Sequence, residues 1–446
     1  MTFWRLALRN LGRNRKRNLA TGSAIAFGFA GILLLAAYGY RARNYIRVYT
    51  IYVVHTGHLA IFAPGGFENF AFRPGRYSLS REDQARAVAA LKAEPEVELF
   101  ETQVRGQGLV GNGCVSYPFV AQGYEPEVDR ALRVHPEVKR WMPKFQYLLA
   151  GEGLSTYGED VGPVLLSKGL SLALGKTRVH RDFPADGRAP ALPDCARARE
   201  QAALDANVQL LAGSWGGHIS AVDGEVVGVY TTGVQETDNS ALIASRERLQ
   251  KLFDTDRATE IAAWLKHPDR LPEVRARLGA RLPALEPRVW DEEPLSPYYV
   301  GTVGFLSTIV VAGALVMASI IALSVLNSST MTILERSQEI GMYRAMGFRR
   351  AHIRLLYVQE SLWLSGVSLL AGTALGLAAI RLVNGAHIQF HPPGVAGGLE
   401  LLLILPPGQA VLIAALILAL VAVATFFAVS NRLRPTPADL LGGTLR

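Results

Sequence analysis

Four long apolar blocks, at residues 19–40, 298–326, 355–380 and 408–430, constrain the fold of this chain more than any other feature. Each block reaches or exceeds the ~20 residues that an α-helix needs to cross a hydrocarbon core of ~30 Å. None shows the polar stripe of an amphipathic helix, so burial in the core of a soluble protein is the weaker interpretation. The sequence therefore predicts four transmembrane α-helices.

Basic residues gather in the segments that flank these blocks. The segment 1–18 carries six basic residues and no acidic one, the segment 327–354 carries five arginines, and the tail 431–446 carries three. Since basic flanks stay in the cytoplasm, both termini and 327–354 are predicted to be cytoplasmic, and 41–297 and 381–407 periplasmic. The pI is near 9.5. We attribute the basic excess to attraction between these flanking segments and anionic lipid rather than to binding of nucleic acid.

The first block is predicted to be an uncleaved anchor. Its 22 apolar residues exceed the ~7–15 of the apolar region of a signal peptide, and no clear small-residue cleavage site follows.

The segment 41–297 is long enough to bury a core of its own, and its patterns mix helix and strand. The fold class is therefore a membrane protein with four transmembrane α-helices and a large α+β extracytoplasmic domain between helices 1 and 2. The local predictions are strands within 45–62, a helix at 80–93 with Ser80 and Asp83 as a capping box, a hairpin at 217–232 with its turn at Asp223-Gly224, a helix at 239–253 and a Pro-rich loop at 179–199.

No stretch of the chain makes a convincing catalytic or nucleotide site. The segment 169–177, GLSLALGKT, has five residues between its first Gly and its Gly-Lys-Thr, whereas a P-loop has four. A helix at 167–174 that ends at Gly175 is the better interpretation. The histidine pairs His55/His58 and His387/His391 lack an obvious third metal ligand. Cys114 and Cys195 lie where a disulfide is permitted, and the sequence leaves their pairing open.

The third block combines glycines with one acid. Gly372 and Gly376 have the spacing that lets membrane helices approach closely. Glu360 has two interpretations: an interfacial carboxylate paired with Arg354 or Arg350, or a buried and functional one.

The charged segment between the second and third blocks has the composition of a short amphipathic helix. Residues 331–346 contain no proline, and Gly347 is placed to end a helix. Such a helix could dock into a groove on a soluble partner or lie on lipid.

The stretch ERSQEIGMYRAMGFRRAHI, which begins at Glu335, resembles the E-R-x-x-E-I-G-x-x-(R/K)-A-x-G segment of MacB/FtsX-type ABC transporter permeases. The Gln359-Glu360-Ser361 triplet, the Gly-rich third block and the finish from Arg434 to Leu441 fit the same pattern. In the periplasmic segment, 56–61, 122–126 and 227–238 are most similar to the lipoprotein-releasing LolC/LolE-type subunits.

The resemblance implies a permease subunit that works by mechanotransmission. Two permease chains, this one and a second copy or a paralogue, would pair with two cytoplasmic ABC ATPase subunits that bind ATP and Mg²⁺, and this chain would hold no cofactor and catalyse no reaction. The implied substrate is a lipoprotein released from the bacterial inner membrane, with a periplasmic carrier. The alternatives are MacB-like efflux of a periplasmic substrate and FtsX-like regulation of a cell-wall hydrolase. The residues implied in ATPase coupling are Glu335, Arg336, Glu339, Ile340, Gly341, Arg344, Met346 and Gly347.

A lipid-anchored substrate would meet the chain where the first and second blocks leave the membrane on the periplasmic side. The residues predicted there are Tyr40, Arg43, Tyr299 and Phe305. Tyrosines and arginines at these depths are also ordinary interfacial anchors.

Overall fold

The computed structural model describes residues 15–183, 195, 205–292, 295–390 and 399–432. The chain forms two compact units: one comprises 1–43, 303–389 and 400–446, and the other 44–302 and 390–399. The predictions for His391, for the tail finish at 434–441 and for most of the Pro-rich loop and the N-terminal basic segment lie outside the described residues.

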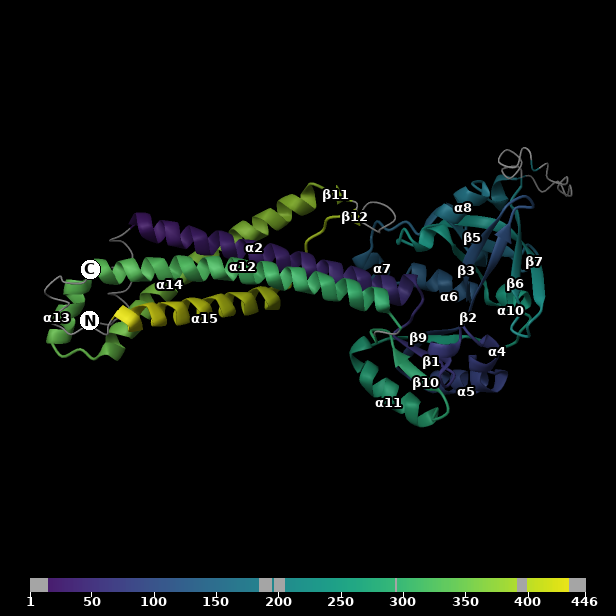
Figure 1. The fold of residues 1–446 in the computed structure, drawn as a ribbon, viewed down its shortest axis with the longest axis horizontal. Helices are drawn as coiled ribbons and strands as arrows, with labels where there is room; N and C mark the ends of the chain where they lie inside the picture. The colour runs from purple at the N-terminus through teal and green to yellow at the C-terminus, as the bar shows by residue number, and fades with distance from the viewer. Residues whose placement is uncertain (1–14, 184–194, 196–204, 293–294, 391–398, 433–446) are drawn as a thin grey trace. The chain divides into compact units, whose positions relative to one another are not determined.

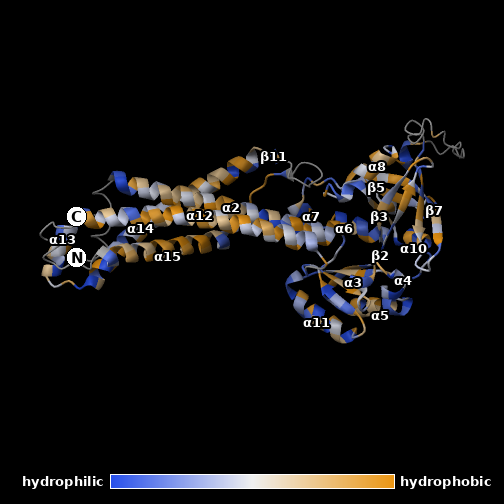
Figure 2. Ribbon diagram, viewed as in Figure 1, coloured by the Kyte–Doolittle hydropathy of each residue, from blue (hydrophilic) through white to orange (hydrophobic). Residues whose placement is uncertain are grey.

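Four long helices contain the four predicted apolar blocks (Figure 1). They are α2 (Arg15–Val48), α12 (Pro297–Glu335), α14 (Arg350–Gly385) and α15 (Pro407–Arg432), and each is long and apolar enough to cross a membrane. Figure 2 shows hydrophobic residues along most of α15 and much of α12. A shorter helix, α13 (Ser337–Ala345), lies between α12 and α14 in the chain, and the short strands β11 (Gln389–Phe390) and β12 (Leu399–Glu400) lie between α14 and α15.

The helices of the first unit pack around α2. Its Ile25, Phe29 and Leu33 contact Ile321 and Val325 of α12 and members of α14 and α15 in one apolar cluster. The predicted close approach at the glycines of α14 is confirmed: a Cβ at position 372 would lie 2.7 Å from the carbonyl oxygen of Ala26, and one at 376 would lie 3.3 Å from the Leu33 side chain. Small residues thus let α14 and α2 touch through their backbones.

The second unit holds an α/β domain in which six of the described strands close into a ring. β2 pairs with β3 and β6, and the pairings continue from β3 through β8, β5 and β7 back to β6. The strands are β2 (Val97–Gly111), β3 (Ser116–Tyr124), β5 (Pro163–Ser167), β6 (Asn207–Gly213), β7 (Ile219–Tyr230) and β8 (Ala241–Ser245). The ring encloses an apolar core that includes Val110, Phe119, Leu166, Leu210 and Leu242.

The long strand β2 joins this ring to a smaller sheet. Its first half pairs with β9 (Glu260–Leu265), which continues to β1 (Leu59–Phe62) and the edge strand β10 (Glu286–Val289); β4 (Leu148–Gly151) lies on β7. The helices of this unit are α3 (Gly66–Asn69), α4 (Pro74–Tyr77), α5 (Arg81–Lys92), α6 (Pro126–Arg133), α7 (Pro136–Trp141), α8 (Lys168–Leu174), α10 (Arg246–Leu252) and α11 (Leu271–Arg281).

Several local predictions for this domain are confirmed. Ser80 and Asp83 form the capping box of α5, and α8 ends at Gly175 in the left-handed conformation, with φ of 70°. Cys114 and Cys195, whose pairing the sequence left open, form a disulfide with their Cα atoms 5.3 Å apart.

Three local predictions are wrong. Within 45–62, only Leu59–Phe62 is a strand, because α2 continues to Val48 and a π-helical turn, η1 (Tyr49–Val53), follows with buried side chains. The segment 217–232 is no hairpin: β7 runs straight through Gly224, whose missing side chain leaves room for Val164 of β5. The predicted helix at 239–253 begins as the strand β8, which lies between β3 and β5, and becomes helical only at Arg246. Burial in the first case, and strand pairing in the other two, override local propensity.

The contact of α14 with α2 predicts opposite effects for two glycines of the same helix. Gly372→Ala should lower the thermal unfolding midpoint of the chain in nanodiscs, since overpacking of this kind costs about 1–3 kcal/mol. Gly366→Ala should leave the midpoint unchanged or raise it slightly, because nothing lies within 4 Å of its Cβ position and alanine is the better helix former. Equal midpoints for the two variants would contradict the packing described above.

Candidate functional site

The segment between the second and third long helices folds into a helical elbow (residues 327–354). The prediction of one continuous helix over 331–346 is wrong, because α12 ends at Glu335 and α13 begins at Ser337, with Arg336 between them at φ −108° and ψ 18°. The chain turns again at Gly347, where φ of 88° favours glycine. Gly347 therefore ends the second helical piece, as predicted.

The break at Arg336 has an electrostatic cause. The side chain of Arg336 is 8% exposed and its Nη1 lies 3.4 Å from Oε2 of Glu360, which is 12% exposed. Glu360 is therefore paired with Arg336 rather than with the predicted Arg354 or Arg350, and the guanidinium of Arg354 lies over the ring of Phe426. A buried charge is tolerated when it is paired, so the helix turns where the pair can form.

A small apolar core stabilises the inner side of the elbow. Ile333, Ile340 and Ile353 pack with Tyr357 of α14 and Val429 of α15. Gly341 is also buried in this core. Three of the predicted coupling residues, Arg336, Ile340 and Gly341, therefore hold the elbow together and present no contact surface.

The outer side of the elbow exposes apolar residues. Met342 is 49% exposed, Met346 60% and Phe348 41%. Of the remaining predicted coupling residues, Glu335 and Gly347 are exposed and Glu339 and Arg344 half-buried. The sequence prediction missed Met342 and Phe348, although the spacing of Met342 and Met346, four residues apart, could have indicated a shared face.

One arginine joins the start of α2 to the elbow. Arg17 places Nη1 2.6 Å from Oε2 of Glu335 and donates from Nη2 to Oγ1 of Thr332 at 2.8 Å. These contacts join the start of α2 to the last turns of α12.

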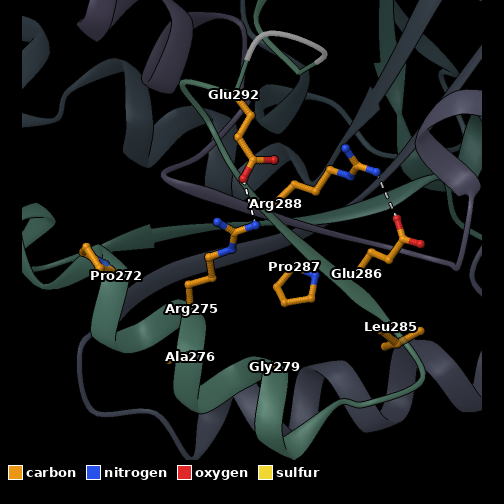
Figure 3. Close-up of a pocket in the computed structure, with 9 residues that line it drawn as sticks. All are labelled: Pro272, Arg275, Ala276, Gly279, Leu285, Glu286, Pro287, Arg288 and Glu292. Carbon is orange, nitrogen blue, oxygen red and sulfur yellow. Dashed lines mark hydrogen bonds and ion pairs between the residues drawn. The ribbon is translucent and has the colours of Figure 1, made fainter.

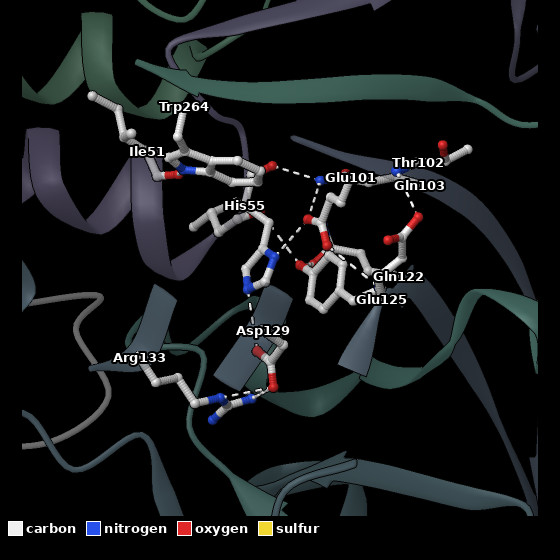
Figure 4. Close-up of polar contacts among 12 residues, drawn as sticks. Ile51, His55, Glu101, Thr102, Gln103, Gln122, Glu125, Asp129, Arg133 and Trp264 are labelled. Carbon is white, nitrogen blue, oxygen red and sulfur yellow. Dashed lines mark hydrogen bonds and ion pairs between the residues drawn. The ribbon is translucent and has the colours of Figure 1, made fainter. Parts of the chain in front are cut away.

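The first long helix leads, through η1, into a buried polar network of the α/β domain (Figure 4). His55 has a positive φ of 60°, and its ring lies between two carboxylates, with Nδ1 2.7 Å from Oε1 of Glu101 and Nε2 3.2 Å from Oδ1 of Asp129. The ring stacks on Tyr124 with a centroid separation of 3.8 Å. Trp264 donates from Nε1 to the carbonyl oxygen of Ile51 at 2.9 Å, which fixes the π-helical turn.

The two carboxylates keep this histidine protonated. Burial alone would lower the pKa of His55, but Glu101 and Asp129 outweigh it and raise the pKa from 6.5 to about 9. Burial acts in the same direction on His58, whose pKa falls to about 3, and its Nδ1 accepts from the backbone N–H of Leu265 at 3.0 Å. His55 thus forms ion pairs, whereas neutral His58 accepts a backbone hydrogen bond. In the described part of the chain, no three His, Cys, Asp or Glu side chains are arranged to hold a metal.

The residues predicted for substrate access are divided between the two units. In the first unit, Arg43 donates to Oγ of Ser307 at 3.1 Å, Phe305 is 70% exposed and Tyr40 is half-buried. In the second unit, the ring of Tyr299 packs edge-on against Trp290 with centroids 4.5 Å apart. The structure brings Arg43 next to α12, the helix that carries Phe305, and gives Tyr299 a packing role.

A cavity of about 600 Å³ lies between α11 and β10 (Figure 3). Its charged side chains neutralise one another: Arg275 lies 2.8 Å from Glu292, and Arg288 lies 3.2 Å from Glu286. The cavity therefore selects no charged ligand. Pro287 also removes a backbone donor from β10, so this edge strand is a poor template for an added strand.

Residues 311–437, which include the elbow, match the family FtsX-like permease C-terminal. The pyoverdine export ATP-binding/permease protein PvdT of Pseudomonas syringae is 28% identical over 198 residues, which cover 42% of this chain and 30% of PvdT. The macrolide export ATP-binding/permease protein MacB of Hyphomonas neptunium is 24% identical over 153 residues, 33% of this chain and 24% of MacB. The chain thus spans less than a third of the length of these relatives.

Among solved structures, the periplasmic region of MacB from Actinobacillus actinomycetemcomitans aligns with 52% of this chain and 88% of its own at 12% identity, with a TM-score of 0.30. The sequence matches support a relationship to permeases of the MacB/FtsX type: residues 311–437 match the FtsX-like permease C-terminal family, and the chain is similar in sequence to the export proteins PvdT and MacB. The predicted fold class is confirmed, with an α/β domain between the first and second of four apolar helices. The predicted closeness to LolC/LolE-type subunits stays a prediction.

The charged state of His55 makes the stability of the domain depend on pH. The pKa in the folded state, about 9, exceeds the unfolded value of 6.5, so the stabilisation is complete below pH ~6.5 and is lost as the pH rises through about 9, with a size on the order of 3 kcal/mol. The thermal midpoint of the full chain should fall over this range. His55→Gln should lower the midpoint at neutral pH and flatten this part of the profile, whereas His267→Gln, at an exposed histidine, should change neither. A parallel decline in His55→Gln and in the unmodified chain would refute the assignment.

Proposed function

We propose that this chain is the permease subunit of an ABC transporter that works by mechanotransmission. A separate cytoplasmic ABC ATPase subunit would bind ATP and Mg²⁺, dock on the elbow and move it during each cycle. The observation that carries the proposal is the elbow itself, which has a rigid buried side and an exposed apolar side within the region that matches the FtsX-like family. A helical anchor with exposed apolar residues is a common way to bind a partner's groove.

The elbow is built to pass a displacement on to the long helices. The Arg336–Glu360 pair and the isoleucine core join it to α14 and α15, and Arg17 joins it to α2. A push on Met342 or Met346 would therefore move several helices together, because a packed core is not freely deformable.

The first long helix offers a direct route to the α/β domain. No loop separates α2 from η1, whose Thr50, Ile51 and Tyr52 are buried in the domain. The hydroxyl of Tyr49 donates to the carbonyl oxygen of Thr232, and Trp264 holds Ile51. The proposal requires that a displacement of α2 reach the domain through this continuous segment of chain.

The membrane setting of the proposal is the bacterial inner membrane, with both termini and the elbow in the cytoplasm and the α/β domain in the periplasm. The support for this orientation is the clustering of basic residues in 1–18, 327–354 and 431–446. A cytoplasmic ATPase can reach only a cytoplasmic elbow, so the docking experiment below also tests this side assignment.

For the substrate, we propose a lipoprotein that is released from the inner membrane to a periplasmic carrier, with a second permease copy or paralogue completing the complex. The basis is the similarity of the periplasmic segments to LolC/LolE-type subunits. Export of a periplasmic molecule is the second candidate, favoured by relatives whose names specify pyoverdine and macrolide export. FtsX-like regulation of a hydrolase is the third, since the matched domain carries the FtsX name.

Docking of the ATPase on the elbow can be tested by charging its exposed side. Met342→Asp should reduce co-purification of a co-expressed ABC ATPase subunit from the source genome, because the loss of an apolar anchor costs about 2 kcal/mol or more, roughly 30-fold in Kd. Leu172→Asp is the matched control, since Leu172 is a 60% exposed apolar residue of α8 in the other unit. Recovery of as much ATPase with Met342→Asp as with the unmodified chain would contradict the docking proposal.

The substrate candidates can be separated by crosslinking at Phe305. A photoreactive residue at this exposed position should capture a lipoprotein if the lipoprotein proposal is right, and ATP together with a periplasmic acceptor should reduce the adduct. Capture of phospholipid alone, with or without ATP, would reject lipoprotein release and favour the export or regulatory candidates.

A further inference from the structure

A small cavity lined mainly by hydroxyl groups lies where three of the long helices meet. It has a volume of about 20 Å³, and α2, α12 and α14 all contribute to its wall. The polar residues of the wall are Thr21, Ser328, Ser329, Ser361 and Ser365, and the apolar ones are Ile25, Val325 and Leu364. None of the polar residues takes part in the elbow contacts or in the His55 network described above.

One of these hydroxyls lacks a hydrogen-bond partner. Ser365 is 0% exposed, and its Oγ has no partner among the described residues. Ser368, one turn along the same helix, donates instead to the carbonyl oxygen of Leu364 at 2.7 Å. A buried hydroxyl without a hydrogen-bond partner is energetically unfavourable. Because the Ser365 side chain lines the cavity, it indicates a bound ligand that forms the missing hydrogen bond.

The chemistry of the wall defines that ligand as small and neutral. No charged side chain lines the cavity, and Glu360, the acid that precedes Ser361 in α14, is paired with Arg336. Hydroxyl groups both donate and accept, which matches a ligand that does the same. A polar cavity with at least ~10–15 Å³ of usable volume and two or more polar partners is sufficient for one water molecule.

We infer that a single bound water molecule occupies this cavity and joins α2, α12 and α14 through Ser365 and the neighbouring hydroxyls. Its mechanical consequence rests on the proposed function: because hydroxyls and water can exchange partners, the three helices could shift against one another while their hydrogen bonds are retained. The binding of the water itself is independent of that function.

The test is made on the full-length chain in nanodiscs, by a map at a resolution that shows ordered water and by radiolytic labelling in ¹⁸O water. The map should show a peak within hydrogen-bond distance of Ser365 Oγ and of hydroxyls from the other two helices. Ile25, which is fully buried, should be labelled from a slowly exchanging water. Ser365→Val, which fills the space with methyl groups, should abolish the peak and the labelling.

Ser368→Ala is the matched control, since it removes a serine of the same helix that is satisfied by its own backbone, and it should preserve both signals. If Ser365→Val fails to insert, the map and the labelling of the unmodified chain still decide the matter. A Ser365 hydroxyl bonded to its own helix, with no peak and no buried labelling, would overturn the inference. A peak that disappears when sodium is replaced by choline would overturn the neutral ligand in favour of a cation. Loss of ATPase docking in Met342→Asp together with no water peak in the unmodified chain would leave only the proposed function standing, whereas full docking in Met342→Asp with the water peak present would leave only the bound water.

Discussion

Hydrocarbon offers no hydrogen-bond partner to a peptide group, and the architecture of this chain follows from that constraint. Only helices satisfy their own backbone within such a medium, which is why the four apolar blocks become α2, α12, α14 and α15. The same constraint concentrates charge at the helix ends. Four charged residues lie near one end of the bundle, where Arg17 pairs with Glu335 and Arg336 pairs with Glu360.

Two of the buried charged groups of the described chain lie at bends where a helical segment ends. In the first unit, the Arg336–Glu360 pair lies at the bend between α12 and α13. In the second unit, protonated His55 lies directly after the π-helical turn that ends the first long helix, held by Glu101 and Asp129. Removing one member of such a pair leaves an uncompensated charge. Each bend is therefore specific in geometry, as the proposed mechanotransmission would require.

The helix bundle contains two kinds of helix contact: close contacts at two glycines of α14, and a small cavity lined by hydroxyl groups. Gly372 brings backbone against backbone between α14 and α2, and such a contact tolerates little sliding. The cavity beside Ser365 is polar and small, and hydrogen bonds through a water molecule can be rearranged. A fixed contact and an adaptable one on the same pair of helices would define an axis about which they tilt.

The sequence by itself determined the number and approximate extent of the long helices, the α/β domain between the first two, the capping box at Ser80 and the helix stop at Gly175, because each follows from local composition and spacing. It also located the segment proposed to contact the ATPase, through the motif that begins at Glu335. Only the tertiary structure decided that Arg336, Ile340 and Gly341 face inward while Met342 and Phe348 face outward, since that depends on which helix supplies the partner of Arg336. It likewise decided that 45–53 stays helical, that 241–245 is a strand and that His55 is charged. Burial against distant strands and carboxylates controls those outcomes, and no local pattern contains that information.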